Sequence, residues 1–196
     1  MSKRGKILII TAPSGTGKDT VMEMFTSKYP GFRFCRSVTT REKRPGEVEG
    51  ASYFFISKEE YDRMDKAGEL IESIEYVGNK YGTRFDEIDN AIESGENLIM
   101  ILSHHGMEQI KRHYENDVIA VFMFPPSLDE LRRRLVTRGR ETAEQIEQRM
   151  GNASNEIATA VHYKYFVVNK RDEVEQCADD IYNIIKECCQ NESKEA

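Results

Sequence analysis

A glycine-rich turn that ends in a lysine contains the residues of this sequence best suited to hold a phosphate group. It comprises residues 12–20, APSGTGKDT, and follows directly after the apolar run KILIIT. Gly15 and Gly17 allow the backbone to curl so that its N–H groups point inward at phosphate oxygens, and Lys18 adds a positive charge. We predict that residues 12–20 form a phosphate-binding loop, called the phosphate loop below.

Two positions of the phosphate loop depart from the usual pattern of such loops. Ala12 stands where glycine is usual, and Asp19 stands where serine or threonine usually offers a hydroxyl to magnesium. The first change is mild. The second places a carboxylate in the metal region, so Asp19 is a candidate magnesium ligand.

A second group of residues could surround another phosphate. Arg41 and Arg44 are three residues apart, and Tyr53 follows beyond a glycine turn. Two guanidinium groups and a phenol can together bind the oxygens of one phosphate. Basic residues also cluster at 132–140, and a solvated surface is the simpler interpretation of either cluster taken alone.

Short apolar runs are expected to form the strands that position these residues. They comprise residues 6–11, 97–102, 118–124 and 165–168. At least three are fully apolar rather than alternating, which is typical of buried parallel strands. Because helical patterns separate the runs, the sequence predicts an α/β fold with a mostly parallel sheet.

Local signals mark where several helices begin. Ser57, Ser127 and Thr142 each precede a segment with the spacing of a capping box, and residues 172–189 form an amphipathic pattern. Residues 32–84 differ, because they have little helical periodicity and include the strand-like segment 52–56. This interval predicts a β-rich subdomain inserted after the first helix.

The composition narrows the class of protein and its partners. The 196 residues suffice for one compact domain, and a net charge of −6 argues against a nucleic-acid binder. The cysteines have no metal-ligand or paired spacing, and no apolar run reaches the length of a membrane span. We therefore expect a reduced, cytoplasmic protein that binds neither nucleic acid nor membrane, either a monomer or a homodimer.

Taken together and in this order, the motifs resemble the guanylate kinase family. The resemblance covers nearly the whole chain. Besides the phosphate loop and residues 37–53, it rests on Ile71-Glu72, Gly78–Thr83, Pro125-Pro126-Ser127, Leu135–Thr142, Arg149 and Val168-Asn169. It implies an ATP-dependent nucleoside monophosphate kinase that transfers the γ-phosphoryl group of ATP to GMP.

The resemblance also implies an arrangement of the chain. A parallel sheet of the P-loop NTPase type, flanked by helices, would be built from residues 1–33, 85–126 and 160–196. A small β-rich subdomain that binds GMP would comprise about residues 34–84, and a helical lid about residues 127–159. All three would belong to one domain that spans residues 1–196.

Site residues are carried over from the family by position. GMP would be held by Ser37, Arg41, Arg44, Tyr53, Glu72, Tyr81 and Thr83. ATP would be held by Ser14, Gly15, Thr16, Gly17, Lys18, Asp19, Thr20 and Asn169, with Mg²⁺ as the cofactor. Lys18, Arg41, Arg138 and Arg149 would act in catalysis by neutralising charge on the transferring phosphoryl group.

The chemistry of guanine agrees with a role for Glu72. Guanine presents an N1–H and an N2–H₂ donor side by side, and one carboxylate can accept hydrogen bonds from both. Adenine lacks this paired edge and would leave the carboxylate unpaired, which costs roughly 1–3 kcal/mol or more for a charged group.

One segment departs from the family pattern. Ile101 and Ser103 replace two acidic residues that help to organise magnesium and the guanine side of the site, and His105 replaces a glutamine. Three interpretations remain open. Asp19 could compensate from the loop side, the protein could bind nucleotides while transferring phosphate poorly, or His104 and His105 could recruit another metal. For His105, a role as a hydrogen-bond donor to the cleft is favoured over a metal.

Two alternatives to a GMP kinase follow from these departures. A catalytically weakened homologue could serve as a nucleotide-binding or protein-interaction module. A related kinase could phosphorylate a different small acceptor. The retained phosphate loop argues against the first, and the complete guanine set of Ser37, Glu72 and Thr83 argues against the second.

Overall fold

The computed structural model describes residues 4–51, 53–76, 78–139 and 142–195. In chain order its elements are β1 (Ile7–Thr11), α1 (Lys18–Lys28), β2 (Phe32–Phe34), β3 (Ser37–Thr39), β4 (Tyr53–Phe55), α2 (Lys58–Lys66), β5 (Leu70–Tyr76), β6 (Asn79–Arg84), α3 (Phe85–Glu93), β7 (Asn97–Ile101), α4 (His104–Tyr114), β8 (Val118–Phe124), α5 (Leu128–Arg138), α6 (Ala143–Ala158), β9 (Tyr165–Val168) and α7 (Val174–Glu195). Short 3₁₀ helices comprise Glu115–Asp117 and Thr159–His162.

The strands form a five-stranded sheet with the order β2-β7-β1-β8-β9 and a four-stranded sheet with the order β4-β3-β6-β5. The pairs β2–β7 and β8–β9 are parallel, so the predicted α/β class with a parallel sheet flanked by helices is confirmed. The four apolar runs became β1, β7, β8 and β9, within a residue of the expected bounds. Strand β2 was not predicted, because three residues show no periodicity and only the pairing with β7 makes them a strand.

Two compact units make up the chain. Unit 1 comprises residues 1–7, 31–100 and 108–118, and unit 2 comprises residues 8–30, 101–107 and 119–196. The four-stranded sheet lies in unit 1, and the phosphate loop lies in unit 2. Among the described residues, no helix is sufficiently long and apolar to cross a membrane.

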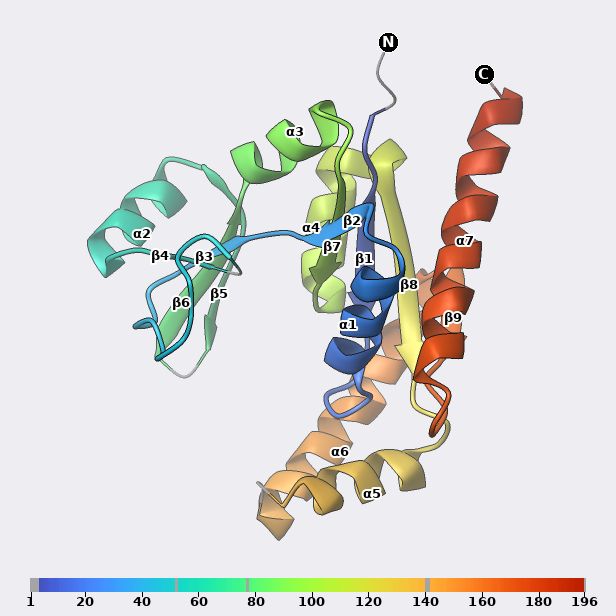
Figure 1. Cartoon of the computed structure of the whole chain (residues 1–196). Coiled ribbons are helices and arrows are strands. Elements are labelled where there is room, and N and C mark those ends of the chain that lie inside the picture. Colours follow the sequence, from blue (N-terminus) through green and yellow to red (C-terminus); the bar gives the residue numbers. More distant parts are fainter. Residues whose placement is uncertain (1–3, 52, 77, 140–141, 196) are drawn as a thin grey trace. The chain divides into compact units, whose positions relative to one another are not determined.

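Helices α1 and α7 of unit 2 lie side by side (Figure 1). Tyr29, directly after α1, stacks on Tyr182 of α7 with 3.8 Å between ring centroids. Lys28 donates to Glu175 and Asp179 of α7 at 2.7 and 2.9 Å. These contacts fix the C-terminal end of the helix that begins at the phosphate loop. Helix α7 extends to Glu195, beyond the expected end at residue 189.

The helix starts predicted from capping signals are confirmed. The Ser57 and Ser127 hydroxyls each accept from the backbone N–H three residues later, at 3.1 Å. Thr142 accepts from Gln145, whose side chain accepts from the Thr142 N–H in return, which completes a capping box. Helices α5 and α6 then pack against each other through an apolar cluster of Leu131, Leu135, Ile146, Met150 and Ala153.

The four-stranded sheet of unit 1 lies within residues 37–84, inside the interval that the sequence predicted to be rich in β-structure. Strand β6 pairs antiparallel with both β3 and β5, and it aligns Thr83 with Glu72. Tyr61 of α2 is fully buried, and its hydroxyl donates to the Tyr81 carbonyl oxygen at 2.7 Å. Helix α2 thereby holds the middle of β6 in place. Of the expected strand 52–56, residues 53–55 form β4, and Ser52 lies outside the described residues.

Candidate active site

Glycine is required twice in the phosphate loop. Gly15 and Gly17 have φ angles of 92° and 94°, a conformation that other L-residues rarely adopt. A Cβ atom at Gly17 would lie 2.7 Å from the Asn169 side-chain nitrogen, and one at Gly15 would lie 2.8 Å from a Leu135 methyl carbon. The backbone conformation therefore favours glycine at both positions, and a side chain at either one would also push Leu135 or Asn169 aside.

Arg134 and Asn169 hold the phosphate loop from outside. The Thr16 carbonyl oxygen accepts from Arg134 Nη1 and from Asn169 Nδ2, each at 2.8 Å. Arg134 Nη2 also donates to the Asn169 carbonyl oxygen at 3.0 Å, and its Nε donates to Glu130 at 2.9 Å. Asn169, which is 3% exposed, is thus part of the structure that shapes the loop.

Arg134 was not among the predicted site residues. In the sequence it is one of several arginines in the basic cluster 132–140, and its spacing does not distinguish it from its neighbours. Its position in α5, opposite the Thr16 carbonyl, sets it apart. A cavity of about 300 Å³ borders Arg134 and both glycines of the loop, with Arg133 and Thr137 as its other lining residues.

Other predicted residues of unit 2 gather at the same loop. Arg149 of α6 donates to the Ser14 hydroxyl at 2.5 Å, and Lys18 Nζ donates to the Ala12 carbonyl oxygen at 3.4 Å. Thr16 is fully buried, and its hydroxyl has no hydrogen-bond partner among the described residues. Asp19 and Thr20 are exposed in the first turn of α1. The loop thus carries a lysine, an arginine contact and an exposed carboxylate.

Some of the predicted lid lies outside the described residues. Arg138 is the last residue of α5, but its side chain is outside the part of the structure that is described. Residues 140 and 141 are outside it as well.

The residues expected to read guanine form a hydrogen-bonded chain in unit 1. The Thr83 hydroxyl donates to Glu72 at 2.9 Å and lies 3.5 Å from the Ser37 hydroxyl. Since the Thr83 proton goes to the carboxylate, Ser37 is the donor of the longer contact. Thr83 is fully buried, so the three side chains are fixed by the pairing of β3, β5 and β6.

The residues expected to hold the acceptor phosphate form a second group in unit 1. Arg41 lies over Tyr53, with 5.7 Å from its guanidinium carbon to the ring centroid. The Tyr53 and Tyr81 rings meet edge to face at 6.0 Å. Arg41 also makes a bidentate pair with Glu47, at 3.0 and 2.7 Å, and Glu47 accepts from the Arg44 backbone N–H at 2.7 Å. Arg44 itself is exposed. The Glu47 carboxylate thus presents Arg41 with the two-oxygen edge that a phosphate would offer.

The Arg41–Glu47 pair gives a titration that can be measured. Hydrogen bonds from Arg41, and next from the Arg44 backbone, lower the pKa of Glu47 from 4.5 to about 2. A carboxylate with a lowered pKa stabilises the fold above its ordinary pKa and loses that contribution as the pH falls through its folded value. We expect the pair to persist at neutral pH and to be lost between about pH 4.5 and 2. Carboxyl-carbon NMR of Glu47 measures this, and Arg41→Met should raise the pKa toward its ordinary value, with the hydrogen bond from the Arg44 backbone still lowering it in part. An ordinary pKa in the unmutated protein would contradict the pairing.

The segment that departs from the family pattern begins a helix rather than continuing a strand. Strand β7 ends at Ile101, and the Ser103 hydroxyl accepts from the Gly106 backbone N–H at 3.2 Å in the first turn of α4. The His104 ring stacks on His162 with 4.7 Å between centroids, whereas His105 is exposed. The two neighbouring histidines therefore have different surroundings. Among the described residues, no three His, Cys, Asp or Glu side chains are grouped as a metal site would need.

Comparison with known proteins gives consistent matches over most of the chain. The family model described as guanylate kinase matches residues 4–188. A guanylate kinase of Oceanobacillus iheyensis is 38% identical over 95% of this chain and 89% of its own length. One of Streptococcus pyogenes is 41% identical over 95% of this chain and 87% of its own length.

Solved structures agree with the sequence relatives. The crystal structure of guanylate kinase from Anaplasma phagocytophilum is similar with a TM-score of 0.69 and 31% identity, over 95% of this chain and 87% of that one. A gluconokinase from Sinorhizobium meliloti, with 14% identity and a TM-score of 0.52, shares the fold alone.

Proposed function

The chain belongs to the guanylate kinase family, and we propose on that premise that it converts ATP and GMP to ADP and GDP, with the phosphate loop of unit 2 binding ATP and unit 1 binding GMP. The observation that carries the assignment of ATP is the loop itself. Its glycines have φ angles of 92° and 94°, Lys18 follows them, and Arg149 contacts Ser14. A loop of this geometry at a helix N-terminus presents N–H donors to phosphate oxygens.

GMP fits the two groups of residues in unit 1. The Ser37–Thr83–Glu72 chain offers a carboxylate acceptor to the paired donors of guanine, and the burial of Thr83 fixes its direction. Arg41, Tyr53 and Tyr81 offer a guanidinium fork and phenols to the 5′-phosphate. In this proposal the phosphate displaces Glu47 from Arg41, one bidentate partner for another.

The transfer step needs charge neutralisation and alignment more than proton transfer. Phosphoryl transfer passes through a loose transition state whose charge is spread over the equatorial oxygens. Lys18 and Arg149 bring two positive charges to the phosphate loop, and we assign them to the phosphates of ATP. Arg41 would hold the acceptor phosphate still, so that its oxygen attacks in line.

Mg²⁺ is the cofactor that we propose for ATP. The metal is commonly held by one or two carboxylates together with substrate phosphates and waters, so the single exposed carboxylate of Asp19 in the first turn of α1 fits it. When bound, the ion would neutralise charge on the β- and γ-phosphates. Ser103, which stands where the family has an acidic residue, offers no carboxylate and already caps α4. Asp19 is the only acidic residue of the phosphate loop.

Removing the Asp19 charge tests its assignment. We expect Asp19→Asn to raise the half-maximal Mg²⁺ concentration about tenfold or more, because metal affinity depends on the charge of the ligands. Asp19→Ser, which restores the usual hydroxyl, serves as the comparison. If Asp19→Asn leaves the Mg²⁺ dependence unchanged, the carboxylate does not serve the metal.

The activity itself is tested by a coupled assay of ADP release from the purified chain with ATP, Mg²⁺ and GMP, AMP, CMP or UMP. We expect release that depends on GMP and is much weaker with the other three. Calorimetric binding of GMP and ATP without turnover would overturn the proposal, and so would a preference for another acceptor.

Arg134 gives a prediction specific to the ATP side. Arg134→Met removes both hydrogen bonds that it makes to the loop and to the strand end. Because each net hydrogen bond to a charged group contributes about 1.5–3 kcal/mol, we expect KM for ATP to rise at least about tenfold while KM for GMP stays constant. Arg132→Met is the matched control, since Arg132 lies on the same helix, pairs with Glu147 of α6 and is not among the residues described as lining the cavity at the loop. Equal KM values for ATP in both variants would contradict a role for Arg134 in shaping the loop.

A further inference from the structure

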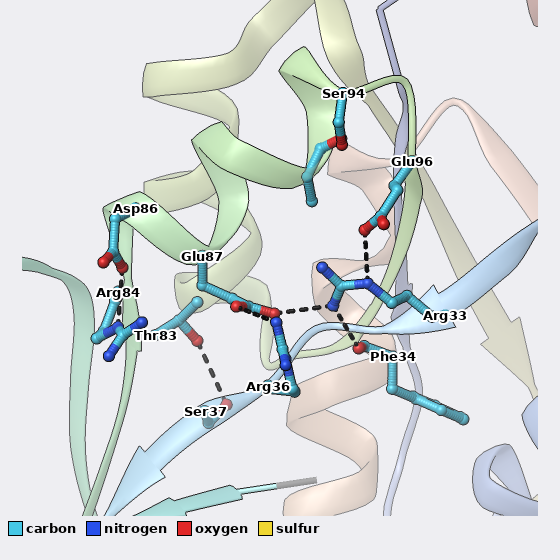
Figure 2. A network of polar contacts seen from close by, with 11 residues as sticks. Arg33, Phe34, Arg36, Ser37, Thr83, Arg84, Asp86, Glu87, Ser94 and Glu96 are labelled. Carbon is cyan, nitrogen blue, oxygen red and sulfur yellow. Dashed lines mark hydrogen bonds and ion pairs between the residues drawn. The ribbon is translucent and has the colours of Figure 1, made fainter. Parts of the chain in front are cut away.

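A buried carboxylate in unit 1 binds two arginines. Glu87 of α3 is 5% exposed, and both of its oxygens accept from Arg36, each at 2.8 Å. Arg33 donates to the same carboxylate at 2.8 Å and to Glu96 at 2.8 Å (Figure 2). None of the residues of this cluster is among those assigned above to a substrate or to the transfer step.

The cluster lies near the start of β3 and the end of β6, the strands that contain Ser37 and Thr83. Arg36 directly precedes Ser37, the first residue of β3, and Glu87 lies four residues after Thr83, near the end of β6. Figure 2 shows the Ser37–Thr83 contact beside the Arg36–Glu87 pair. The bidentate pair therefore connects the residue before Ser37 with a residue four positions after Thr83, across 51 positions of sequence.

A second contact aligns the same chain segments. The Arg36 guanidinium carbon lies 5.2 Å from the centroid of the Phe54 ring, and that of Arg84 lies 4.9 Å from the same centroid. Phe54 pairs with Val38 in the sheet, and Arg84 directly follows Thr83. Arg36 is thus held by its bidentate contact with Glu87 and by its contact with the Phe54 ring. These contacts leave little freedom for the backbone at Ser37.

Such a pair contributes more to geometry than to stability. Burial of a carboxylate removes its hydration, and the attraction of its partners offsets that loss only when the geometry is good. For Glu87, burial raises the pKa, but the hydrogen bonds from Arg36 and Arg33 outweigh it, and the pKa is lowered overall. The carboxylate is therefore ionised at neutral pH and keeps both guanidinium groups in fixed directions.

We propose that the Arg36–Glu87 pair is a positioning device for guanine recognition, which holds Ser37 and Thr83 at the spacing that the base requires. The inference rests on the proposed function, because it needs GMP to be the acceptor. Arg36 and Glu87, which are not among the proposed GMP-binding residues, would thereby contribute to the affinity for GMP and to the preference for guanine. Arg33 of β2 donates both to Glu87 and to Glu96, which directly precedes β7, and so limits the movement of Glu87.

The test compares Glu87→Gln and Arg36→Lys with a control on the same helix. Glu87→Gln keeps the shape but removes the charge, and Arg36→Lys keeps the charge but removes the fork. Asp86→Asn is the control, because Asp86 is an exposed carboxylate that pairs with Arg84 at 2.8 Å, one residue before Glu87. KM for GMP, KM for ATP, kcat and the ratio of kcat/KM for GMP and AMP are measured for each, together with thermal unfolding.

We expect Glu87→Gln and Arg36→Lys to raise KM for GMP about tenfold and to lower the preference for GMP over AMP, with KM for ATP within about twofold. Asp86→Asn should resemble the unmutated protein. Loss of folded protein lowers kcat by reducing the active fraction but does not raise KM for one substrate alone. A KM for GMP in Glu87→Gln equal to that in Asp86→Asn would overturn the inference.

A double variant separates positioning from stability if a single variant unfolds. Arg36→Met with Glu87→Leu removes both charges, so neither partner is left buried alone, and it should fold. Positioning predicts that its KM for GMP remains raised although the fold is retained, whereas a purely structural role predicts the unmutated KM. The unmutated protein separates a failure of the proposed function from a failure of the positioning role. If it releases no ADP with GMP, the proposed function fails, and if it is active while all variants retain its KM, only the positioning role fails.

Discussion

Replacement of Lys18 by methionine should lower kcat about 10³-fold, a loss of about 4 kcal/mol of transition-state stabilisation. Methionine keeps the length of the side chain but removes the only lysine charge of the phosphate loop. Because charge develops on the phosphoryl oxygens during transfer, the loss should affect kcat more than KM for GMP, for which we propose a site on residues of unit 1. Steady-state kinetics with each nucleotide varied in turn measures the split.

Lys28→Met is the matched control for Lys18→Met. Lys28 is at the other end of α1, where it makes ion pairs with Glu175 and Asp179 of α7. The same substitution there removes these two ion pairs but no charge of the phosphate loop. We expect kcat in this variant to stay within about twofold of the original, since exposed pairs contribute about 0–1 kcal/mol to stability. A similar kcat in Lys18→Met and Lys28→Met would mean that Lys18 does not act on the transferring group.

Glu72→Gln should lower kcat/KM for GMP by roughly 10–100-fold while changing the value for AMP little. Glutamine can still accept from Thr83, which contacts Glu72 at 2.9 Å, but its amide places a donor where guanine also presents one. The cost of one unsatisfied buried donor is about 1–3 kcal/mol, which sets the size of the effect. The ratio of kcat/KM for GMP and AMP is the measurement.

The control for Glu72→Gln lies on the same strand. Glu75 of β5 is exposed and pairs in register with Lys80, so Glu75→Gln makes the same substitution three residues away. It should leave the GMP-to-AMP ratio unchanged. An unchanged ratio in Glu72→Gln as well would show that another group reads the guanine edge.

Local features of the fold could be predicted because they depend on residues a few positions apart. The helix starts at Ser57, Ser127 and Thr142 each require a side-chain oxygen and a backbone N–H three residues later, and the chain folds that way. The left-handed conformations at Gly15 and Gly17 follow from the same short range. Periodicity also located β1, β7, β8 and β9, since buried parallel strands are apolar throughout.

The sequence by itself therefore determined the α/β class, the phosphate loop and, through its ordered motifs, the family. Only the tertiary structure decided which charged residues support the site. Arg134 reaches the loop from 118 positions away, and Arg36 meets Glu87 across 51. Contacts over such distances depend on strand pairing and helix packing, which bring Arg134 to the Thr16 carbonyl oxygen and leave its neighbour Arg133 exposed. Residue type and spacing cannot predict which arginine contacts the loop, because the arginines of one cluster are chemically the same until the fold gives them different partners.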